Sequence, residues 1–507
     1  MTDLLLDHAS PGATTCVIVG RFDAASAAAE LATFRSVLWF VDREAGMLAR
    51  QALANVRVEA VLLEETPAGS VAPTLDRFVV RDGRHLPHLR VTRGVSTRDT
   101  GAYEFVMGEI QSVFERMGRA RRTRQEEGFL WQKQFLLNLP DYVSRRVPAS
   151  WAGALRGLPA FVCGAGPSLD VSAACLTAVA DDGVVFAADS ALRTLARHGV
   201  QADFAVSVDA TKPPEKCLAP DVDPARVVLA GISPPSWREA IQHDRIHFLS
   251  SRHLTEDWLA ARGVARTPIA VAENCGNTAL ELARFMGCSP IYLFGMDLAA
   301  DAADPSRRHT GSADATIDRG SGFGKSNDLP LVPGNYAENV PTFLFGEWRA
   351  LDSRLAGWPP GLVVNVNDRG ARLGNTTLVH PAQFHFQKPA AGKREPLWHL
   401  PSADVAADDA ARAALAELGA LGARAAHAVV PLRAALDVRG PEGVLAELRR
   451  LFANEDLARA MGSFALKVMP HLAPPADGAA DFWSALLDEL AELGCLAESV
   501  YEAPVRS

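Results

Sequence analysis

A series of short, continuous apolar runs between residues 151 and 387 constrains the fold of this chain more than any other feature. Strands that are covered on both faces need such uninterrupted runs, and parallel sheets are built from them. The pattern therefore predicts an α/β fold with a doubly wound parallel sheet, which binds ligands at the carboxyl ends of its strands. We expect strands at Ala160–Cys163, Val184–Ala188, Phe204–Val208, Val227–Ala230, Ile246–Leu249, Ile269–Val271, Ile291–Phe294 and Val363–Val366.

The sequence on either side of this central region has a different character. Residues 1–100 predict a small N-terminal α/β domain, and residues 101–150 predict a helical connector that carries a run of arginines. We interpret that run as a solvated helix face, with a contact for an acidic partner as the alternative. After the central domain, 151–387, a linker at 388–403 leads to an Ala- and Leu-rich helical domain at 404–507.

Within the N-terminal domain the apolar runs again alternate with helical stretches. The expected strands are Thr15–Val19, Val37–Val41 and Val58–Leu63, the expected helices are Ala24–Phe34 and Arg43–Asn55, and Phe78–Arg84 is expected to form a hairpin.

Composition excludes several functional classes. The chain has 507 residues, 48% hydrophobic, as in ordinary soluble proteins. Its net charge of −9 argues against a nucleic-acid binder. The first residues lack the pattern of a signal peptide, and no run of apolar residues is long enough to predict a membrane span. Seven scattered cysteines without a CxxC pair predict reduced thiols in the cytoplasm and no zinc module.

The segment Gly164–Ser168 follows the first central strand and precedes a helix. Gly164 and Gly166 allow a sharp turn and the close approach of another group, and Pro167 suits a first helical turn. A strand, a glycine turn and a helix N-terminus together predict a phosphate site, with a tight packing turn as the alternative. Leu169 replaces the third glycine of a dinucleotide fingerprint, which argues against a dehydrogenase. We expect Gly166→Val to abolish ligand binding and leave the fold largely intact.

Three other central strands end at acidic residues. Asp189-Ser190, Asp209 and Asp297 each follow an apolar run, and the carboxyl ends of parallel strands converge on the ligand crevice. A helix N-cap would also explain Asp189. Capping explains Asp209 and Asp297 less well, so we expect ligand roles for these two.

A further helix opens within Glu273–Glu281. Thr278 and Glu281 have the spacing of a capping box, which is a sufficient structural reason for both. Gly276 and Asn277 are not needed by that box, and they could offer a close backbone and an amide to a nucleotide.

These segments occur in an order that resembles the motility accessory factor (Maf) family of flagellin glycosyltransferases, over about residues 125–385. The motifs that carry the resemblance are Gly164–Leu169, Ala188–Ser190, Val206–Asp209, Gly276–Thr278, Gly287–Ala299, Val332–Asn335, Val340–Thr342 and Asn365–Leu373.

The resemblance implies transfer of a nonulosonic acid, of the pseudaminic or legionaminic type, from a CMP-sugar to Ser or Thr of flagellin. It implies a Rossmann-like core similar to that of bacterial CMP-sialic acid transferases, with no cofactor besides the donor. It also implies which residues contact the nucleotide: Gly164, Ala165, Gly166, Pro167, Ser168, Asp189, Ser190, Asp209, Gly276, Asn277 and Thr278. Ala165, Asp189 and Asp209 stand where those transferases carry Asn. The tyrosines that steady their leaving phosphate have no counterpart in Ala299–Ala303.

The same resemblance aligns His309 with the catalytic base of those transferases. Histidine suits this task, because its ordinary pKa lies near neutral pH. Without the resemblance, an exposed loop histidine is the simpler interpretation. Arg307 or Arg308 would stabilise the donor carboxylate or the leaving phosphate, and Asp297 completes the expected catalytic set.

Two other functions fit parts of the sequence. Archaeal-type 6-hydroxymethylpterin diphosphokinases resemble the central domain alone, and their ATP chemistry would make Asp209 and Asp297 magnesium ligands. A non-catalytic flagellin-binding chaperone would use the helical C-terminal region. His243 and His247 have the spacing of a helical metal pair, but no third ligand is evident, so we expect no metal there.

Overall fold

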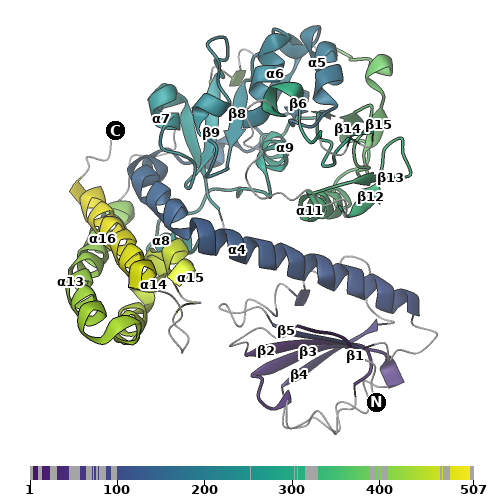
Figure 1. Ribbon diagram of the computed structural model, residues 1–507. Helices are drawn as coiled ribbons and strands as arrows, with labels where there is room; N and C mark the ends of the chain where they lie inside the picture. Colours follow the sequence, from purple (N-terminus) through teal and green to yellow (C-terminus); the bar gives the residue numbers. More distant parts are fainter. Residues whose placement is uncertain are drawn as a thin grey trace. The chain divides into compact units, whose positions relative to one another are not determined.

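The computed structural model describes residues 4–8, 14–22, 31–44, 57–63, 71, 74–75, 78, 87–92, 100–251, 253–301, 303–304, 307–314, 329–388, 396–397, 399–401, 409–468, 471 and 480–502. The chain forms two compact units (Figure 1). The first comprises Met1–Glu126 with Met469–Ala473, and the second comprises Glu127–Val468 with Pro474–Ser507. The boundary lies inside the long helix α4, Thr100–Ser144, which accounts for most of the predicted connector at 101–150.

The first unit contains a five-stranded sheet in the order β1-β5-β2-β3-β4. The three predicted strands are present, and β1 and β5, which pair antiparallel, were not predicted. Phe78 is helical, so it does not begin a hairpin, and residues 79–84 lie outside the described part of the chain, as do most residues of the two predicted helices. The strands are β1 (Leu4–His8), β2 (Thr15–Val19), β3 (Ser36–Val41), β4 (Val58–Leu62) and β5 (His88–Thr92).

The second unit is built on an eight-stranded sheet in which every pair of neighbours is parallel. Its order is β10-β9-β8-β7-β6-β11-β14-β15. Every residue of β6, β7, β8 and β10 is buried, as expected for strands covered on both faces. The strands are β6 (Ala160–Cys163), β7 (Val184–Ala188), β8 (Phe204–Ser207), β9 (Arg226–Ala230), β10 (Ile246–Leu249), β11 (Ile291–Phe294), β14 (Val363–Val366) and β15 (Thr377–Val379).

The predicted strand Ile269–Val271 is wrong. Ala270 makes only an isolated bridge to Ser250. The Ser250 amide donates to the Thr267 hydroxyl at 2.8 Å, and the Thr267 amide donates to the Ser250 hydroxyl at 3.0 Å, so side chains take the place of ladder partners. The sequence also did not predict β15 or the short antiparallel pair β12 (Leu331–Pro333) and β13 (Asn339–Pro341).

The direction in which successive strands are added to the sheet changes between β6 and β11. The chain runs outward from β6 to β10, then returns to place β11 on the other side of β6. A crevice forms outside the carboxyl ends of the strands at such a switch point, and ligands of doubly wound sheets bind there. The helices that contribute to this edge are α5 (Leu169–Thr177), α6 (Leu192–Arg197) and α9 (Cys275–Phe285).

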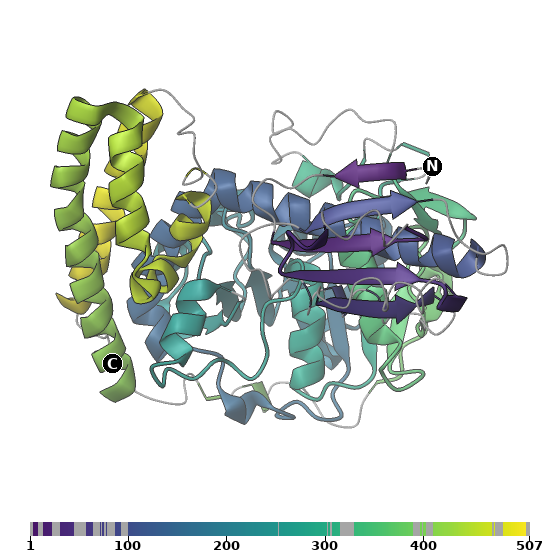
Figure 2. The same ribbon diagram turned by 90° about the horizontal axis from the view of Figure 1, so that it is seen from below.

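The C-terminal part of the second unit is helical, as predicted. Figures 1 and 2 show α13 (Asp409–Phe452) lying along α16 (Ala480–Glu502), with α14 (Glu455–Ala460) and α15 (Gly462–Val468) between them in the chain. By length and composition alone α13 could cross a membrane, which the sequence analysis did not anticipate. Its most apolar window is 44% buried within the protein, and the core helix of a soluble protein passes the same test.

These helices are bonded to the central part of the same unit. The side chain of Gln132 in α4 donates to the carbonyl of Ala460 at 3.2 Å and accepts from the amide of Ser463 at 3.0 Å. Arg262 pairs with Glu417 and with Asp456. A buried amide that donates and accepts in this way fixes the register of the contact, because either bond left unmade would leave a polar group unsatisfied.

Glu256 is a buried carboxyl group beside this contact, in α8 (Leu254–Ala260). Its Oε2 accepts from the amide of Ser251 at 2.6 Å and from the Ser251 hydroxyl at 3.1 Å. Burial raises the pKa of Glu256 from 4.5 to about 7, and the bonds from Ser251 oppose that rise only in part. The folded chain therefore holds a proton on Glu256 between these pH values, whereas the unfolded chain does not.

We expect Glu256→Gln to stabilise the protein at pH 8 and to leave its stability unchanged near pH 4. In the wild type, the contribution of Glu256 to the free energy of unfolding falls as pH rises from 4.5 to about 7. Above that range the free energy of unfolding of the variant should exceed that of the wild type by about 3 kcal/mol. Urea unfolding across pH 4–8 measures it. Glu239→Gln, at an exposed position, is the matched control, and equal curves for both variants would contradict the prediction.

Candidate functional site

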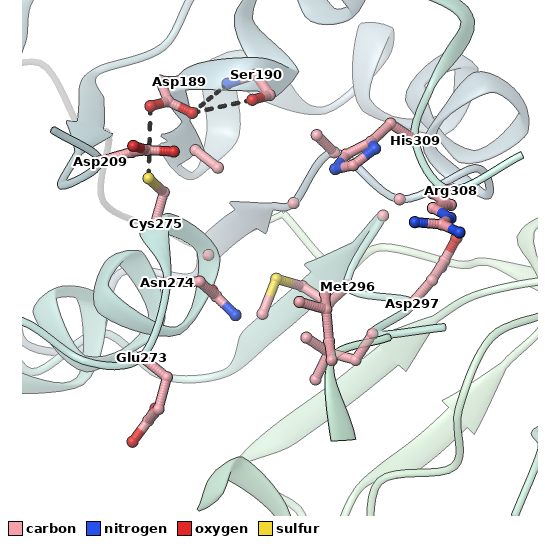
Figure 3. Close-up of a pocket in the computed structure, with 18 of the residues that line it drawn as sticks. Asp189, Ser190, Asp209, Glu273, Asn274, Cys275, Met296, Asp297, Arg308 and His309 are labelled. Carbon is pink, nitrogen blue, oxygen red and sulfur yellow. Dashed lines mark hydrogen bonds between the residues drawn. The ribbon is translucent and has the colours of Figure 1, made fainter. Parts of the chain in front are cut away.

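A pocket of about 350 Å³ opens at the carboxyl edge of the central sheet, at the switch point (Figure 3). Its walls come from the segments that follow β6, β7, β8 and β11, from the first turn of α9 and from the loop before α10 (Gly311–Asp314). Most of the predicted site residues line it: Gly164, Ala165, Gly166, Asp189, Ser190, Asp209, Gly276, Asp297, Arg308 and His309. Pro167, Ser168, Asn277 and Thr278 do not.

The glycine turn packs directly against the segment that follows β11. The amides of Gly164 and Gly166 donate to the carbonyls of Phe294 and Gly295, each at 2.8 Å. A Cβ on Gly164 would lie 2.5 Å from the Gly295 carbonyl oxygen, and Gly295 itself has a φ of +63°, which favours glycine. The sequence predicted that another group approaches this turn closely. In the structure that group is the backbone of Gly295.

Asp297 occupies the anion position at the start of α5. Its carboxylate accepts from the amide of Ser168 at 2.7 Å, from the Ser168 hydroxyl and from the side chain of Asn367 at 2.8 Å. Burial raises the pKa of Asp297, and the bonds from Ser168 and Asn367 offset only part of that rise. One amide of the predicted phosphate site, that of Ser168, is thus satisfied by a carboxylate of the protein, and the amides of Gly164 and Gly166 donate to backbone carbonyls, so Asp297 fixes the turn.

This packing overturns the expectation that Gly166→Val leaves the fold intact. A Cβ on Gly166 would lie 2.6 Å from the Asp297 carboxylate. We expect Gly166→Val to lower the free energy of unfolding by about 1–3 kcal/mol, the usual cost of overpacking. Urea unfolding measures this against Gly357→Val, where a Cβ would keep an ordinary distance of 3.6 Å from its nearest neighbour. Wild-type stability in Gly166→Val would restore the first interpretation.

Asp189 is buried and collects donors from three segments. Its carboxylate accepts from the amide of Ser190 at 2.6 Å, from the hydroxyl of Ser207 at 2.8 Å and from the thiol of Cys275 at 3.5 Å (Figure 3). Asp189 therefore ties together the ends of β7 and β8 and the start of α9. The predicted N-cap alternative is not its main role, because most of these donors come from outside the helix that follows it.

Asp209 is exposed at the end of β8 and shapes its own loop. Its Oδ1 accepts from both the amide and the hydroxyl of Thr211 at 2.8 Å, which turns the chain back toward the pocket. Figure 3 shows Asp209 on the same side of the pocket as Asp189 and Cys275.

The capping box predicted for α9 is wrong. The helix begins at Cys275, and Asn274 is its N-cap, accepting from the amide of Asn277 at 2.8 Å. Thr278 lies within the first turns, where its hydroxyl donates to the carbonyl of Asn274. Gly276 does line the pocket, where a Cβ would meet the sulfur of Met296 at 2.7 Å.

Asn277 is directed away from the pocket. Its amide donates to Glu273 at 3.2 Å and to the backbone of Glu347. Glu273 is also bound by Arg354 through two bonds of 3.0 and 2.5 Å. Burial by itself would raise the pKa of Glu273, but the pairing with Arg354 outweighs it and lowers that pKa.

The loop that carries Arg308 and His309 is held on both sides. One oxygen of Asp170, in α5, accepts from the guanidinium of Arg307 at 2.6 Å and from the amide of Gly311 at 3.1 Å. The amide of Thr310 donates to the carbonyl of Ala165 in the glycine turn at 2.9 Å. Arg307 is therefore occupied by Asp170, and Arg308 and His309 are the two side chains of this loop that line the pocket.

Phe343 packs against both of these side chains. The Arg308 guanidinium lies 5.0 Å from the centre of the Phe343 ring, and the His309 ring lies 6.0 Å from it. Contacts with an aromatic ring restrict the positions of the Arg308 guanidinium and the His309 imidazole, and they do not involve hydrogen bonds from the nitrogen atoms of either group.

Sequence analysis missed Lys212, Cys275 and Phe343. Lys212 follows the strand-end residue Asp209 by three positions, and Phe343 follows the motif Val340–Thr342 directly, so both lay beside segments that were singled out. Their roles depend on loop geometry that local sequence does not specify.

No three His, Cys, Asp or Glu side chains gather to hold a metal ion among the residues that the structure describes. His243 bonds Asp141 at 2.5 Å, and the His247 ring packs against Trp151 at a tilt, with ring centres 4.7 Å apart, so the two histidines have different surroundings.

Comparison with known proteins gives two similarities. A sequence model of the family described as 6-hydroxymethylpterin diphosphokinase MptE-like matches residues 133–302. Among solved structures, a Maf glycosyltransferase from Magnetospirillum magneticum AMB-1 is similar over 98% of this chain and 80% of that chain, with 17% identity and a TM-score of 0.52. Among curated proteins, none matches the chain. The second similarity establishes a shared fold, and it agrees with the family resemblance inferred from the motifs at that level.

Proposed function

We propose that this protein is an inverting glycosyltransferase that moves a nonulosonic acid from a CMP-sugar to Ser or Thr of flagellin. One observation carries the proposal: Arg308 and His309 line the same pocket as the glycine turn and the strand-end residues Asp189 and Asp209. The fold shared with a Maf glycosyltransferase over nearly the whole chain supports it. The pterin family match ends at residue 302, before the loop that carries His309.

The donor fits the pocket by position and size. A switch point of a parallel sheet is the usual place for a nucleotide, and the pocket's volume of about 350 Å³ falls within the range of small-ligand sites. In a Rossmann-like, sialyltransferase-like arrangement the nucleotide would lie along Gly164–Gly166 and the first turn of α9. The Asp297 carboxylate then supports the turn through its bonds to the amide and hydroxyl of Ser168.

His309 acts as general base in this proposal. The acceptor hydroxyl transfers its proton to the imidazole while its oxygen forms a bond to the anomeric carbon of the sugar. The bond from that carbon to the phosphate oxygen breaks, and CMP leaves with the electron pair. Attack on the face opposite the leaving group inverts the configuration. Arg308 stabilises the negative charge of the donor from the same loop.

The free cysteines support a cytoplasmic location for the proposed reaction. All seven are free thiols, although several are buried where a disulfide would be protected. Unpaired cysteines are typical of proteins kept in a reducing compartment.

The pterin diphosphokinase is the second candidate, and the family match at residues 133–302 favours it. That activity needs magnesium, for which Asp209 and Asp297 are the candidate ligands. Asp209 is bonded to Thr211, and Asp297 is bonded to Ser168 and Asn367. The two carboxylates are thus engaged by different parts of the chain, and no cluster of three candidate ligands is found within the described ranges.

Nucleotide preference separates the two candidates. We expect CMP to bind and ATP with magnesium to bind weakly or not at all, because one phosphate suffices for the proposed donor. Isothermal titration of each nucleotide measures this. Tight magnesium-dependent ATP binding without CMP binding would replace the transferase with the diphosphokinase.

The role of His309 has a kinetic signature. We expect His309→Ala to lower sugar transfer by roughly 10²–10⁴-fold, the usual contribution of general-base catalysis. CMP affinity should hardly change, because the base contacts the acceptor hydroxyl and not the nucleotide. Intact-mass analysis of flagellin incubated with donor and enzyme gives the rate.

His385→Ala is the matched control, since His385 is exposed and outside the pocket lining. Normal transfer by His309→Ala would move the base to an acidic strand-end residue such as Asp209. Loss of CMP binding together with transfer would show a damaged pocket and contradict the assignment.

A further inference from the structure

Lys212 is a partly buried lysine whose side chain lines the pocket. The turn capped by Asp209 reverses the chain immediately before it. The indole of the buried Trp237 donates to the carbonyl of Lys212 at 3.1 Å, which fixes the backbone from the other side. These contacts hold the backbone of Lys212 in place while its ammonium group lies at the cavity. The side chain is 23% exposed.

The charge is retained inside the pocket. Burial by itself would lower the pKa of Lys212, but the neighbouring groups together, with the Asp189 carboxylate first among them, outweigh it and the pKa is raised. The ammonium bonds the hydroxyl of Ser190 and lies 3.5 Å from Asp189. Lys212 is thus a fixed cation at any pH near neutrality.

Asp189 does not need this cation to satisfy its oxygens. Donors from Ser190, Ser207 and Cys275 already occupy the carboxylate at distances of 2.6, 2.8 and 3.5 Å. The contact with Lys212 is longer than a hydrogen bond of good geometry. A lysine ammonium has three donors, so capacity remains for a ligand on the side that faces the cavity.

The Ser168 amide at the start of α5, which could otherwise bind a phosphate, is already occupied. Asp297 takes the amide and hydroxyl of Ser168 at the start of α5. Lys212 lies instead toward α9, because both Lys212 and Cys275, the first residue of that helix, contact Asp189. The segment Ala299–Ala303 offers no hydroxyl group to a phosphate.

We propose that Lys212 binds the phosphate of the nucleotide donor, at the end of the pocket formed by Asp189, Ser190 and Cys275. This inference rests on the proposed function for the identity of the nucleotide. The ligand chemistry is a nucleoside monophosphate ester, and the ammonium also balances the charge that develops on the phosphate when the sugar leaves. Lys212 and Arg308 would then hold the donor from two different loops of the pocket.

Isothermal titration with CMP and with cytidine, which lacks the phosphate, tests the inference. We expect Lys212→Met to weaken CMP binding about 10- to 100-fold, the worth of one charge-assisted hydrogen bond. Cytidine binding should not change, and Lys212→Arg should keep most of the CMP affinity. Lys216→Met, at an exposed position on the same loop that does not line the pocket, is the matched control. CMP binding as tight as in the wild type, or an equal loss for both ligands, would overturn the inference.

A measurement on the wild type keeps the test independent of variant folding. CMP affinity should fall with ionic strength while cytidine affinity stays constant, because only the phosphate meets a fixed cation. Equal salt dependence for the two ligands would contradict the inference. If the wild type binds ATP and neither CMP nor cytidine, the proposed function fails separately. The same Lys212 variants titrated with ATP and adenosine then decide whether Lys212 binds phosphate.

Discussion

The contact between the glycine turn and the segment after β11 determines the geometry of the whole pocket. Gly164 and Gly295 approach so closely that neither tolerates a side chain, and the amides of Gly164 and Gly166 donate to the carbonyls of Phe294 and Gly295 across the switch point of the sheet. Asp297 then bonds Ser168 and brings Asn367 from the end of β14 to the same place. Three neighbouring parallel strands are therefore joined at their carboxyl ends by one carboxylate. The loop that carries His309 is bonded to the glycine turn, because the amide of Thr310 donates to the carbonyl of Ala165. The position of His309 therefore depends on the same contact.

The strands of the central sheet could be predicted from sequence because their signal is local. Runs such as Ile291–Phe294 are apolar throughout, and a strand buried on both faces needs nothing else. Ile269–Val271 has the same local signal without forming a strand, because the side chains of Ser250 and Thr267 complete the backbone bonds there. Side chains and neighbouring strands compete here for the same backbone hydrogen bonds. The outcome depends on two residues 17 positions apart, so it cannot be inferred from a short apolar segment.

The candidate site was predictable to a similar extent. The ends of parallel strands identified the segments that line the pocket, since topology brings them together whatever the side chains do. The directions of individual side chains were harder to predict from the sequence. Asn274 and Thr278 are both residues that cap helices, and only the fold selects Asn274. The position of Lys212 depends on Trp237, 25 residues further along the chain, whose indole holds its carbonyl.

Acidic residues at the strand ends of the pocket conflict at first sight with the anionic nucleotide that we propose for it. The structure resolves this conflict through the donors that each carboxylate already accepts. Asp189 is bound by two serines and a thiol, Asp209 by Thr211, and Asp297 by Ser168 and Asn367. Such donors balance part of the negative charge of each carboxylate, and Asp189 also pairs with Lys212. These acidic groups serve chiefly to fix loops, whereas the side chains that retain unused donors toward the cavity are basic. Lys212 and Arg308 line the pocket, and their charge is the reason why we propose an anionic ligand for it.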